Sequence, residues 1–168
     1  MPKVGMEPIR RQALIDATIC EIGQAGSLSV TVSQIAKRAG MSSGLAHHYF
    51  GSKEQMFLAA MRHILRSYGE HVRSELKLVN GPKARLDAII AASFHPLNFV
   101  DEVVSAWLNF YVYARTVPEA GRLLEIYGKR LHSNLVYNLS QLMDRSRAHH
   151  VAQGLSAMID GFYIRHAL

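Results

Sequence analysis

Residues 31–56, TVSQIAKRAGMSSGLAHHYFGSKEQM, constrain the fold more strongly than any other stretch of the chain. Residues that commonly cap helices precede two short segments with apolar residues at helical spacing: Thr31 or Ser33 precedes the first, and Ser42 or Ser43 the second. Gly40 lies between the two segments and suits a helix end that requires a positive φ. The pattern predicts two short helices joined by a tight turn, the helix-turn-helix plan in which the second helix enters the DNA major groove.

The charge and side-chain chemistry of this stretch favour DNA as its partner. Residues 31–53 contain two lysines, one arginine and no acidic residue. The second helix carries hydroxyls and hydrogen-bonding rings where a solvated face usually carries Glu and Lys. Lys53 stands at the start of the next helix, a position that itself favours a phosphate. Short helix pairs around a glycine also occur in proteins that do not bind DNA, so a purely structural role is the alternative.

The run IAKRAGMSSGLAHHYFGSKEQMFLAAM resembles the N-terminal signature of TetR-family transcriptional repressors. The shared features are the IA and AG pairs two residues apart, a Ser-x-Gly, an aromatic pair, and a Lys-Glu start to the following helix. The resemblance covers about residues 9–62, and His47 departs from the Tyr that is common in the family. The N-terminal sequence MPKVGMEPIRRQALIDAT, together with residues 45–50, is most similar to family members that control choline-to-glycine-betaine genes.

The resemblance implies a homodimer bound to a palindromic, double-stranded operator. Two copies of the 43–49 helix would lie in successive major grooves, about 34–36 Å apart. Arg10 and Arg11, at the start of the first helix, would approach the DNA backbone or minor groove, although ordinary solvated arginines fit the sequence equally well. Thr31, Tyr49 and Lys53 would mostly contact the DNA backbone. The other residues expected to contact bases or phosphates are Ser42, Ser43, Gly44, His47 and His48.

The composition predicts a soluble cytoplasmic protein with a substantial core. Hydrophobic residues make up 49% of the chain and charged residues 19%, which excludes a disordered chain. No apolar run is long enough to span a bilayer, the N-terminus lacks the apolar core of a signal peptide, and the single cysteine, Cys20, excludes an internal disulfide. The net charge of +6 favours affinity for a polyanion, but the basic residues occur in both halves of the chain.

Apolar residues recur at helical spacing along the whole chain, without useful strand-like alternation, so we expect an all-α fold. The predicted helices span about residues 8–26, 31–39, 43–49, 52–79, 83–95, 99–115, 118–142 and 148 onward. We expect residues 1–54 to form the DNA-binding domain and residues 55–168 a helical regulatory and dimerisation domain, linked by the 52–79 helix. Family members usually continue with one more helix, so the resemblance implies that a C-terminal helix of the dimer interface is missing from this sequence.

The segment SAWLNFYVYAR, residues 105–115, contains a concentration of aromatic residues. Aromatic faces attract quaternary ammonium groups by roughly 0.5–2 kcal/mol per contact. A choline-like cation is therefore a reasonable effector, and the family resemblance points the same way. The candidate ligand-binding residues are Trp107, Phe110, Tyr111, Asp160 and Tyr163. Aromatic residues at this spacing are also typical of a core, and Asp160 is equally suited to a structural hydrogen bond.

Nothing in the sequence favours catalysis, a cofactor or a metal. The pairs His47-His48 and His149-His150 lack the spacing of a shared zinc site, and there is no phosphate-binding loop or nucleophile elbow. We expect a non-enzymatic repressor of choline-to-glycine-betaine genes, released or modulated by choline or a related quaternary ammonium compound. The alternatives are a repressor that responds to another hydrophobic or cationic ligand, as in efflux control, and a helical small-molecule-binding protein or enzyme with a vestigial DNA-binding head.

Overall fold

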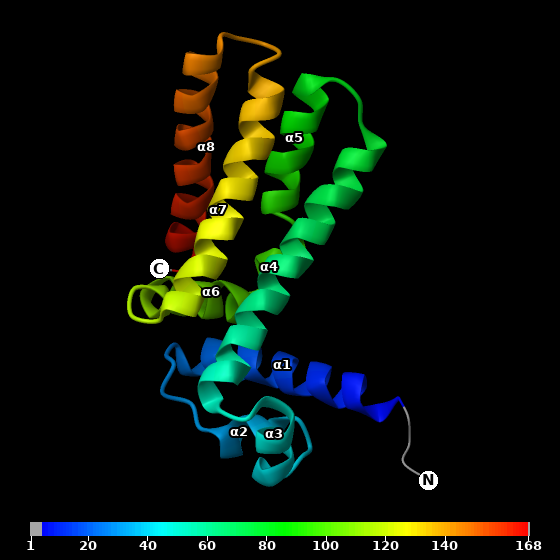
Figure 1. The fold of residues 1–168 in the computed structure, drawn as a ribbon, viewed down its shortest axis with the longest axis vertical. Helices are drawn as coiled ribbons and strands as arrows, with labels where there is room; N and C mark the ends of the chain where they lie inside the picture. Colours follow the sequence, from blue (N-terminus) through cyan, green and yellow to red (C-terminus); the bar gives the residue numbers. More distant parts are fainter. Residues whose placement is uncertain (1–4, 168) are drawn as a thin grey trace.

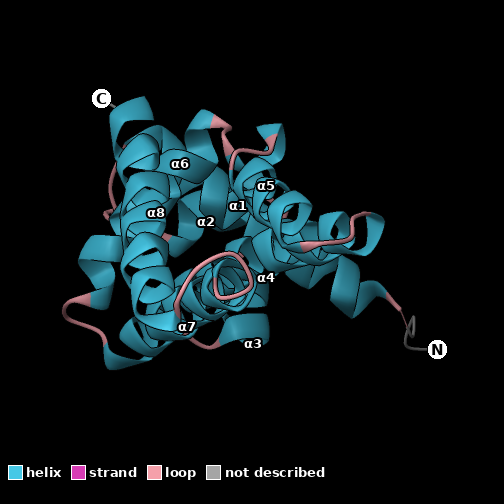
Figure 2. Cartoon of the chain, turned by 90° about the horizontal axis from the view of Figure 1, so that it is seen from above, coloured by secondary structure: helices cyan, strands magenta, loops and turns pink. Residues whose placement is uncertain are grey.

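The computed structural model describes residues 5–167, and within this range the regular structure is helical, which confirms the all-α prediction (Figures 1 and 2). In chain order the elements are α1 (Met6–Ala25), α2 (Val32–Arg38), α3 (Ser43–Phe50), α4 (Lys53–Leu78), α5 (Pro82–Ser93), the short 3-10 helix η1 (Pro96–Asn98), α6 (Asp101–Ala114), α7 (Pro118–Leu139) and α8 (Arg145–His166). Over residues 5–167, none of the helices has the length and apolar character needed to cross a membrane.

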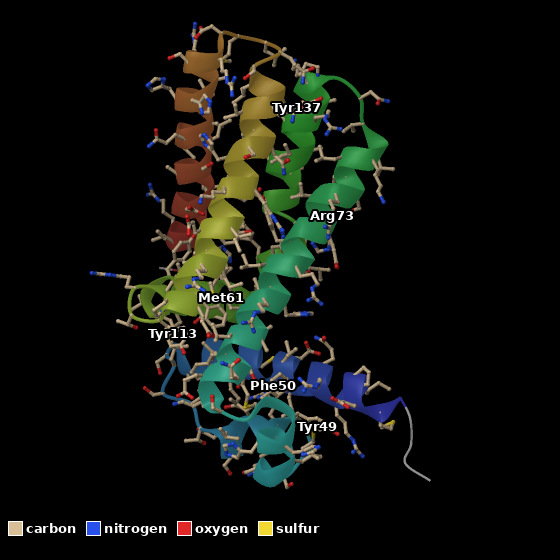
Figure 3. All side chains as sticks on the ribbon, in the orientation of Figure 1. Tyr49, Phe50, Met61, Arg73, Tyr113 and Tyr137 are labelled. Carbon is tan, nitrogen blue, oxygen red and sulfur yellow. The ribbon has the colours of Figure 1, made fainter. Side chains whose placement is uncertain are left out.

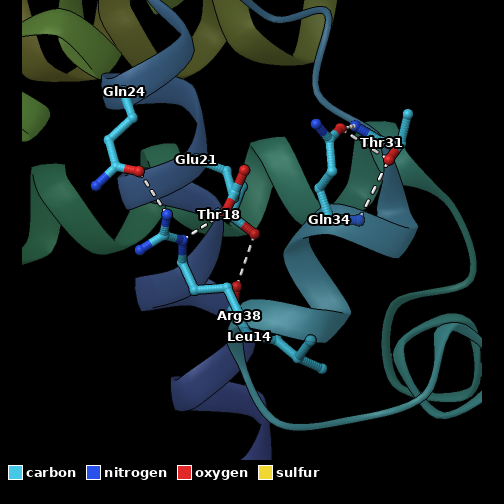
Figure 4. Close-up of polar contacts among 7 residues, drawn as sticks. All are labelled: Leu14, Thr18, Glu21, Gln24, Thr31, Gln34 and Arg38. Atoms are coloured by element: carbon cyan, nitrogen blue, oxygen red, sulfur yellow. Dashed lines mark hydrogen bonds and ion pairs between the residues drawn. The ribbon is translucent and has the colours of Figure 1, made fainter.

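Side-chain caps fix where the helices of the DNA-binding motif begin. Thr31, Ser42 and Ser52 each accept a hydrogen bond from the backbone N–H three residues later. The side chain of Gln34 accepts in return from the backbone N–H of Thr31, at 2.7 Å, and completes a capping box (Figure 4). Between the two short helices Gly40 has a φ of +67°, the left-handed conformation expected from the sequence.

The helices form a head and a bundle that are joined by α4 and α6. In Figure 1, α1, α2 and α3 lie together at one end of the molecule, and α5, α7 and α8 lie at the other. The 26-residue α4 starts in the head and runs along the bundle. Helix α6 lies across the junction, next to α1 (Figure 1). The bundle therefore meets the head through two helices rather than through the single helix that the sequence suggested.

Two clusters of buried apolar side chains form the core. One fills the head and continues into α6 and α7; its members include Leu14, Ile22, Ile35, Met56, Met61, Trp107 and Phe110. The other fills the bundle; its members include Val72, Ile89, Val104, Leu135, Ala152 and Ile159. Because α6 contributes to both clusters, the packing of the head depends on how α6 sits in the bundle. The division into units at residues 54 and 55 stays a prediction.

The turn between α7 and α8 differs from the sequence-based expectation. Helix α7 ends at Leu139 rather than near Leu142, which is 52% exposed beyond the helix end and does not face inward. Helix α8 begins at Arg145, three residues earlier than expected, because Asp144 caps it by accepting from the backbone N–H of Arg147 at 2.9 Å. The apolar pattern correctly locates both helices but not these two ends, and the start of α8 is decided by its cap.

A substitution in the core of the head measures how much the packing there contributes to the free energy of unfolding. Leu14 is completely buried, so Leu14→Ala is expected to lower the free energy of unfolding by about 2–5 kcal/mol through lost burial and the cavity left behind. Ile9, on the same helix, is 62% exposed, and Ile9→Ala should change it by no more than about 0.5 kcal/mol. Urea denaturation of the two variants makes the comparison; equal effects would contradict the packing described here.

Candidate nucleic-acid interface and ligand cavity

The exposed face of α3 carries the side chains that the sequence assigns to base contacts. His47 and His48 are exposed, as are Ser42 and Gly44 at the start of the helix. Ala46 is completely buried and holds the opposite side of α3 against the head. The helix thus presents hydroxyl and imidazole groups outward on a short, capped and anchored support, which is the arrangement that a reading helix needs.

Residues from α1 join this surface. The Arg10 Nη1 atom donates to the Tyr49 hydroxyl at 3.4 Å, and the Arg11 guanidinium carbon lies 5.8 Å from the centroid of the Tyr49 ring. Arg11 also lies 5.1 Å from the Phe50 ring and forms an ion pair of 2.9 Å with Glu7 (Figure 3 labels the two aromatic residues). The two arginines are therefore neither remote from α3 nor simply solvated, and they add positive charge beside its C-terminal end.

Several of the predicted contact residues already make hydrogen bonds within the head. The Thr31 and Ser42 oxygens cap α2 and α3, so these residues position the helices as well as face solvent. The His47 Nδ1 atom lies 3.1 Å from the Gly51 carbonyl oxygen, which only accepts, so Nδ1 carries the proton and Nε2 is left for another partner. Lys53 projects its ammonium group to 5.5 Å from the Phe57 ring centroid, at the start of α4.

Arg38 has a structural task that the sequence did not reveal. Its Nε atom donates to Glu21 at 2.5 Å and its Nη2 atom to Gln24 at 2.5 Å, both on α1 (Figure 4). This fork fixes α2 against the last turns of α1. Glu21 therefore neutralises part of the positive charge counted between residues 31 and 53 at the surface of the head, and Lys37 and Lys53 carry the remaining positive charge.

A small cavity lies in the bundle next to the junction with the head. It is lined by Ile64, Leu65 and Tyr68 of α4, Asn98 of η1, Val103 and Trp107 of α6, Tyr127 of α7, and Tyr163 of α8. Its free space, about 20 Å³, accommodates little more than a water molecule in this conformation. Four helices and a connecting turn meet here, so a ligand that enlarged the cavity would have to move at least one of them.

The aromatic side chains around the cavity meet edge to face. The Tyr127 ring centroid lies 5.3 Å from that of Tyr68 and 5.4 Å from that of Trp107. Of the sequence candidates, Trp107 and Tyr163 line the cavity, whereas Phe110, Tyr111 and Asp160 do not. Phe110 is completely buried in the core cluster shared with the head. Tyr68 and Tyr127 line the cavity as well. The sequence places both on apolar helix faces but gives no sign that they meet.

Asp160 brings a negative charge close to these rings. Its Oδ1 atom accepts from the Tyr111 hydroxyl at 2.9 Å, and Tyr111 packs edge to face on Trp107 at 5.2 Å. Burial raises the pKa of Asp160, although the Tyr111 hydrogen bond opposes the rise. Burial first, and then the charge of Asp160, raise the pKa of Tyr111, so this tyrosine keeps its proton and remains a donor.

The carbonyl end of α5 also faces this region. The Tyr163 hydroxyl donates to the Ser93 carbonyl oxygen, and the Asn98 amide donates to the Ala92 carbonyl oxygen at 3.1 Å. The Tyr68 hydroxyl lies 3.1 Å from the Ser93 Oγ atom. A helix C-terminus carries partial negative charge, so it and Asp160 both favour a positive ligand between the aromatic rings. Within residues 5–167, no cluster of three or more His, Cys, Asp or Glu side chains is suited to hold a metal ion.

Comparison with protein families assigns both halves of the chain. Residues 14–60 match the family model of bacterial regulatory proteins of the tetR family, and residues 82–168 match the C-terminal domain of BetI-type transcriptional repressors. The HTH-type transcriptional regulator BetI of Brucella suis biovar 1 (strain 1330) is 56% identical over 168 residues, which cover the whole of this chain and 85% of that protein.

Solved structures of other transcriptional regulators share this arrangement of helices. A transcriptional regulator from Rhodococcus sp. Rha1 aligns with a TM-score of 0.82 at 23% sequence identity, over 94% of this chain and 83% of that one. A transcriptional regulator from Saccharomonospora viridis, solved in complex with choline, aligns with a TM-score of 0.78 at 22% identity, over 92% of this chain and 83% of that one. At these identities the likeness establishes the arrangement of the helices.

Proposed function

Because the chain belongs to the TetR family of transcriptional regulators, with a C-terminal domain of the BetI repressor type, we propose that it represses genes that convert choline to glycine betaine. The head would bind a palindromic operator as part of a homodimer. Choline or a related quaternary ammonium compound would bind in the bundle and weaken that binding. Operator DNA lies in the bacterial cytoplasm, so the proposal assigns the protein to that compartment, as the sequence predicts.

The exposed α3 face and its basic surroundings support operator binding. His47 and His48 can reach base edges, while Lys53 and the arginines beside Tyr49 can reach phosphates. Apolar side chains left exposed on the last two helices support the homodimer, because a second copy would cover them. They are Tyr137 on α7, and Met158 and Phe162 on α8.

The cavity is the main support for the proposed class of ligand. Tyr68, Trp107, Tyr127 and Tyr163 surround a space whose electrostatics favour a cation, through Asp160 and the carbonyl end of α5. A quaternary ammonium group fits such a site because it offers no hydrogen-bond donor and is attracted by aromatic faces. The choline complex of the Saccharomonospora viridis regulator lends this ligand class further support.

The small size of the cavity suggests how binding would be coupled to DNA release. Choline is far larger than about 20 Å³, so it would bind only a conformation in which the lining helices have separated. Tyr68 lies on α4, which begins in the head, and Trp107 lies on α6, which packs on α1. A ligand that prefers the open cavity shifts the population toward it, and the two heads would then no longer match the operator spacing.

Thermal unfolding with a series of ligands tests the ligand class. Choline and betaine aldehyde are expected to raise the melting temperature in a concentration-dependent manner, since a ligand that binds only the folded state stabilises it. Fatty acyl compounds and bulky amphipathic cations of the kind exported by efflux pumps should do so less. A larger shift with the amphipathic compounds would discard choline and favour the alternative of a repressor with another effector.

The choline affinity should also depend on pH through Asp160. Its ionised form attracts the cation, and burial raises its pKa, so affinity is retained above that pKa and lost as the pH falls through it. The loss should begin at a higher pH than for an ordinary aspartic acid, whose pKa is about 4. Isothermal titration calorimetry from neutral pH downward would show this, and a flat profile would exclude the carboxylate from the site.

A further inference from the structure

A glycine allows α1 and α6 to approach each other unusually closely. A Cβ atom placed on Gly23 of α1 would lie 2.4 Å from the Cα atom of Glu102 and 2.7 Å from its carbonyl oxygen, both of which are backbone atoms of α6. A flexible side chain could turn aside, but backbone cannot. In contrast, a Cβ placed on Gly69 of α4 or Gly128 of α7 would meet nothing within 4 Å. Gly23 is therefore a position where the helix packing itself excludes any side chain.

Each side of this contact leads directly to a functional surface. Glu102 lies in the first turn of α6, and the next residue, Val103, lines the cavity together with Trp107 one turn further on. On the other side, Gly23 belongs to the helix whose beginning carries Arg10, the residue that donates to Tyr49 of α3. The lining of the cavity and the body of the head thus meet backbone to backbone.

The same turn of α1 is hydrogen-bonded to α2 of the DNA-binding motif. Glu21 and Gln24, on either side of Gly23 in the sequence, hold the Arg38 guanidinium at the end of α2 (Figure 4). Any displacement of α1 at Gly23 is therefore passed to α2 through this fork, and from α2 to α3 across the tight turn. This connection is separate from α4, which reaches the head from the C-terminal side of α3 (Figure 1).

We propose that the backbone contact between Gly23 and Glu102 is the point at which the regulatory bundle sets the orientation of the DNA-binding head. Gly23 acts here as a positioning residue: it touches neither DNA nor ligand, and it makes α1 follow the first turn of α6. The inference rests on the proposed repressor function and adds a second route, besides α4, by which the cavity controls operator binding. Packed backbones transmit such a shift because there is no side chain between them to absorb it.

The variant Gly23→Ala tests the contact. Its Cβ atom must move by about 1 Å to reach an ordinary van der Waals distance, so α1 and α6 must separate or rotate. Without any ligand, operator affinity measured by fluorescence anisotropy should fall about 10-fold, the size of a typical coupling energy. Choline affinity, measured by calorimetry on the same protein, should be retained or rise by up to the same factor, because a contact that couples the two sites shifts both binding equilibria.

Gly69→Ala is the matched control, since it adds the same methyl group to another helix at the junction, in open space. It should leave operator and choline binding unchanged. The inference is overturned if folded Gly23→Ala binds the operator, and responds to choline, as Gly69→Ala does. Should wild-type operator binding prove indifferent to choline, the proposed control by choline fails, while the ligand-free comparison of the two variants still decides whether this contact orients the head.

Hydrogen exchange on the wild type tests the contact even if Gly23→Ala does not fold. Addition of choline should change the amide exchange of residues 19–26 of α1, next to the contact, and of residues 101–107 of α6. A change confined to α4 and the cavity helices, with α1 unaltered, would show that the head is controlled through α4 alone and would overturn the inference.

Discussion

Replacing both Tyr49 and Lys53 by alanine is expected to weaken binding to all DNA sequences by about 10-fold or more and to flatten its salt dependence. Lys53 stands at the start of α4 beside α3, and Tyr49 holds Arg10 through its hydroxyl group and lies under Arg11. The double variant removes one positive charge and releases two others from the DNA-facing edge. Each lost phosphate contact reduces the slope of log affinity against log salt by about 0.9.

The salt titration has an internal control on the same helix. Lys77 is exposed in the last turn of α4, at the far end from the head, so Lys77→Ala removes the same charge without touching the proposed interface. Its slope and affinity should match those of the wild type. If the double variant behaved like Lys77→Ala, the α3 edge would not be the DNA-binding surface, and a small-molecule-binding protein with a vestigial head would be the better account.

The second large effect is expected for Asp160→Asn, which should lower choline affinity by about 10-fold or more without destabilising the protein. Asparagine keeps an oxygen that accepts from Tyr111 but removes the negative charge near the aromatic rings. Because burial raises the pKa of Asp160, ionisation of this group opposes folding: its contribution to stability improves as the pH falls through the raised pKa. At neutral pH the neutral amide should therefore leave the free energy of unfolding unchanged or slightly increased.

Loss of ligand binding together with retained stability distinguishes a ligand contact from a structural hydrogen bond. Asp87→Asn, at an exposed position on α5, removes an equal charge away from the cavity and should leave both quantities unchanged. Calorimetry gives the affinity and urea denaturation the stability. A variant Asp160→Asn that binds choline normally but unfolds more easily would assign the carboxylate to the structure of α6 and α8 instead.

Most of the local structure of the head could be predicted, because it is decided by neighbours in the sequence. Thr31, Ser42 and Ser52 cap the helices that follow them, and Gly40 takes the positive φ that ends α2. The apolar pattern alone places the start of α8 three residues too late, although its cap, Asp144, is visible in the sequence. The spacing of residues 31–56 indicates α3 as the candidate reading helix, and the family resemblance supports that prediction.

The cavity and the junction could be predicted only in part, because they are formed by residues distant in the sequence. Aromatic density and helical position identify Trp107 and Tyr163 as ligand candidates. Tyr68 and Tyr127 come from α4 and α7 and meet them only in the folded chain. Phe110 belongs to the same aromatic run and yet packs into the core. Gly23 looks like an ordinary helical glycine until α6 is seen against it.

The most direct test of the account is an electrophoretic mobility shift with the DNA upstream of the chain's own gene, with and without choline, at one fixed salt concentration. The account predicts a specific shift that survives competitor DNA and is weakened by choline. A specific shift that choline does not alter would retain the repressor and reject the ligand. The absence of any specific shift from a folded dimer would contradict the assignment of α3 as a DNA-reading helix, and with it the central claim.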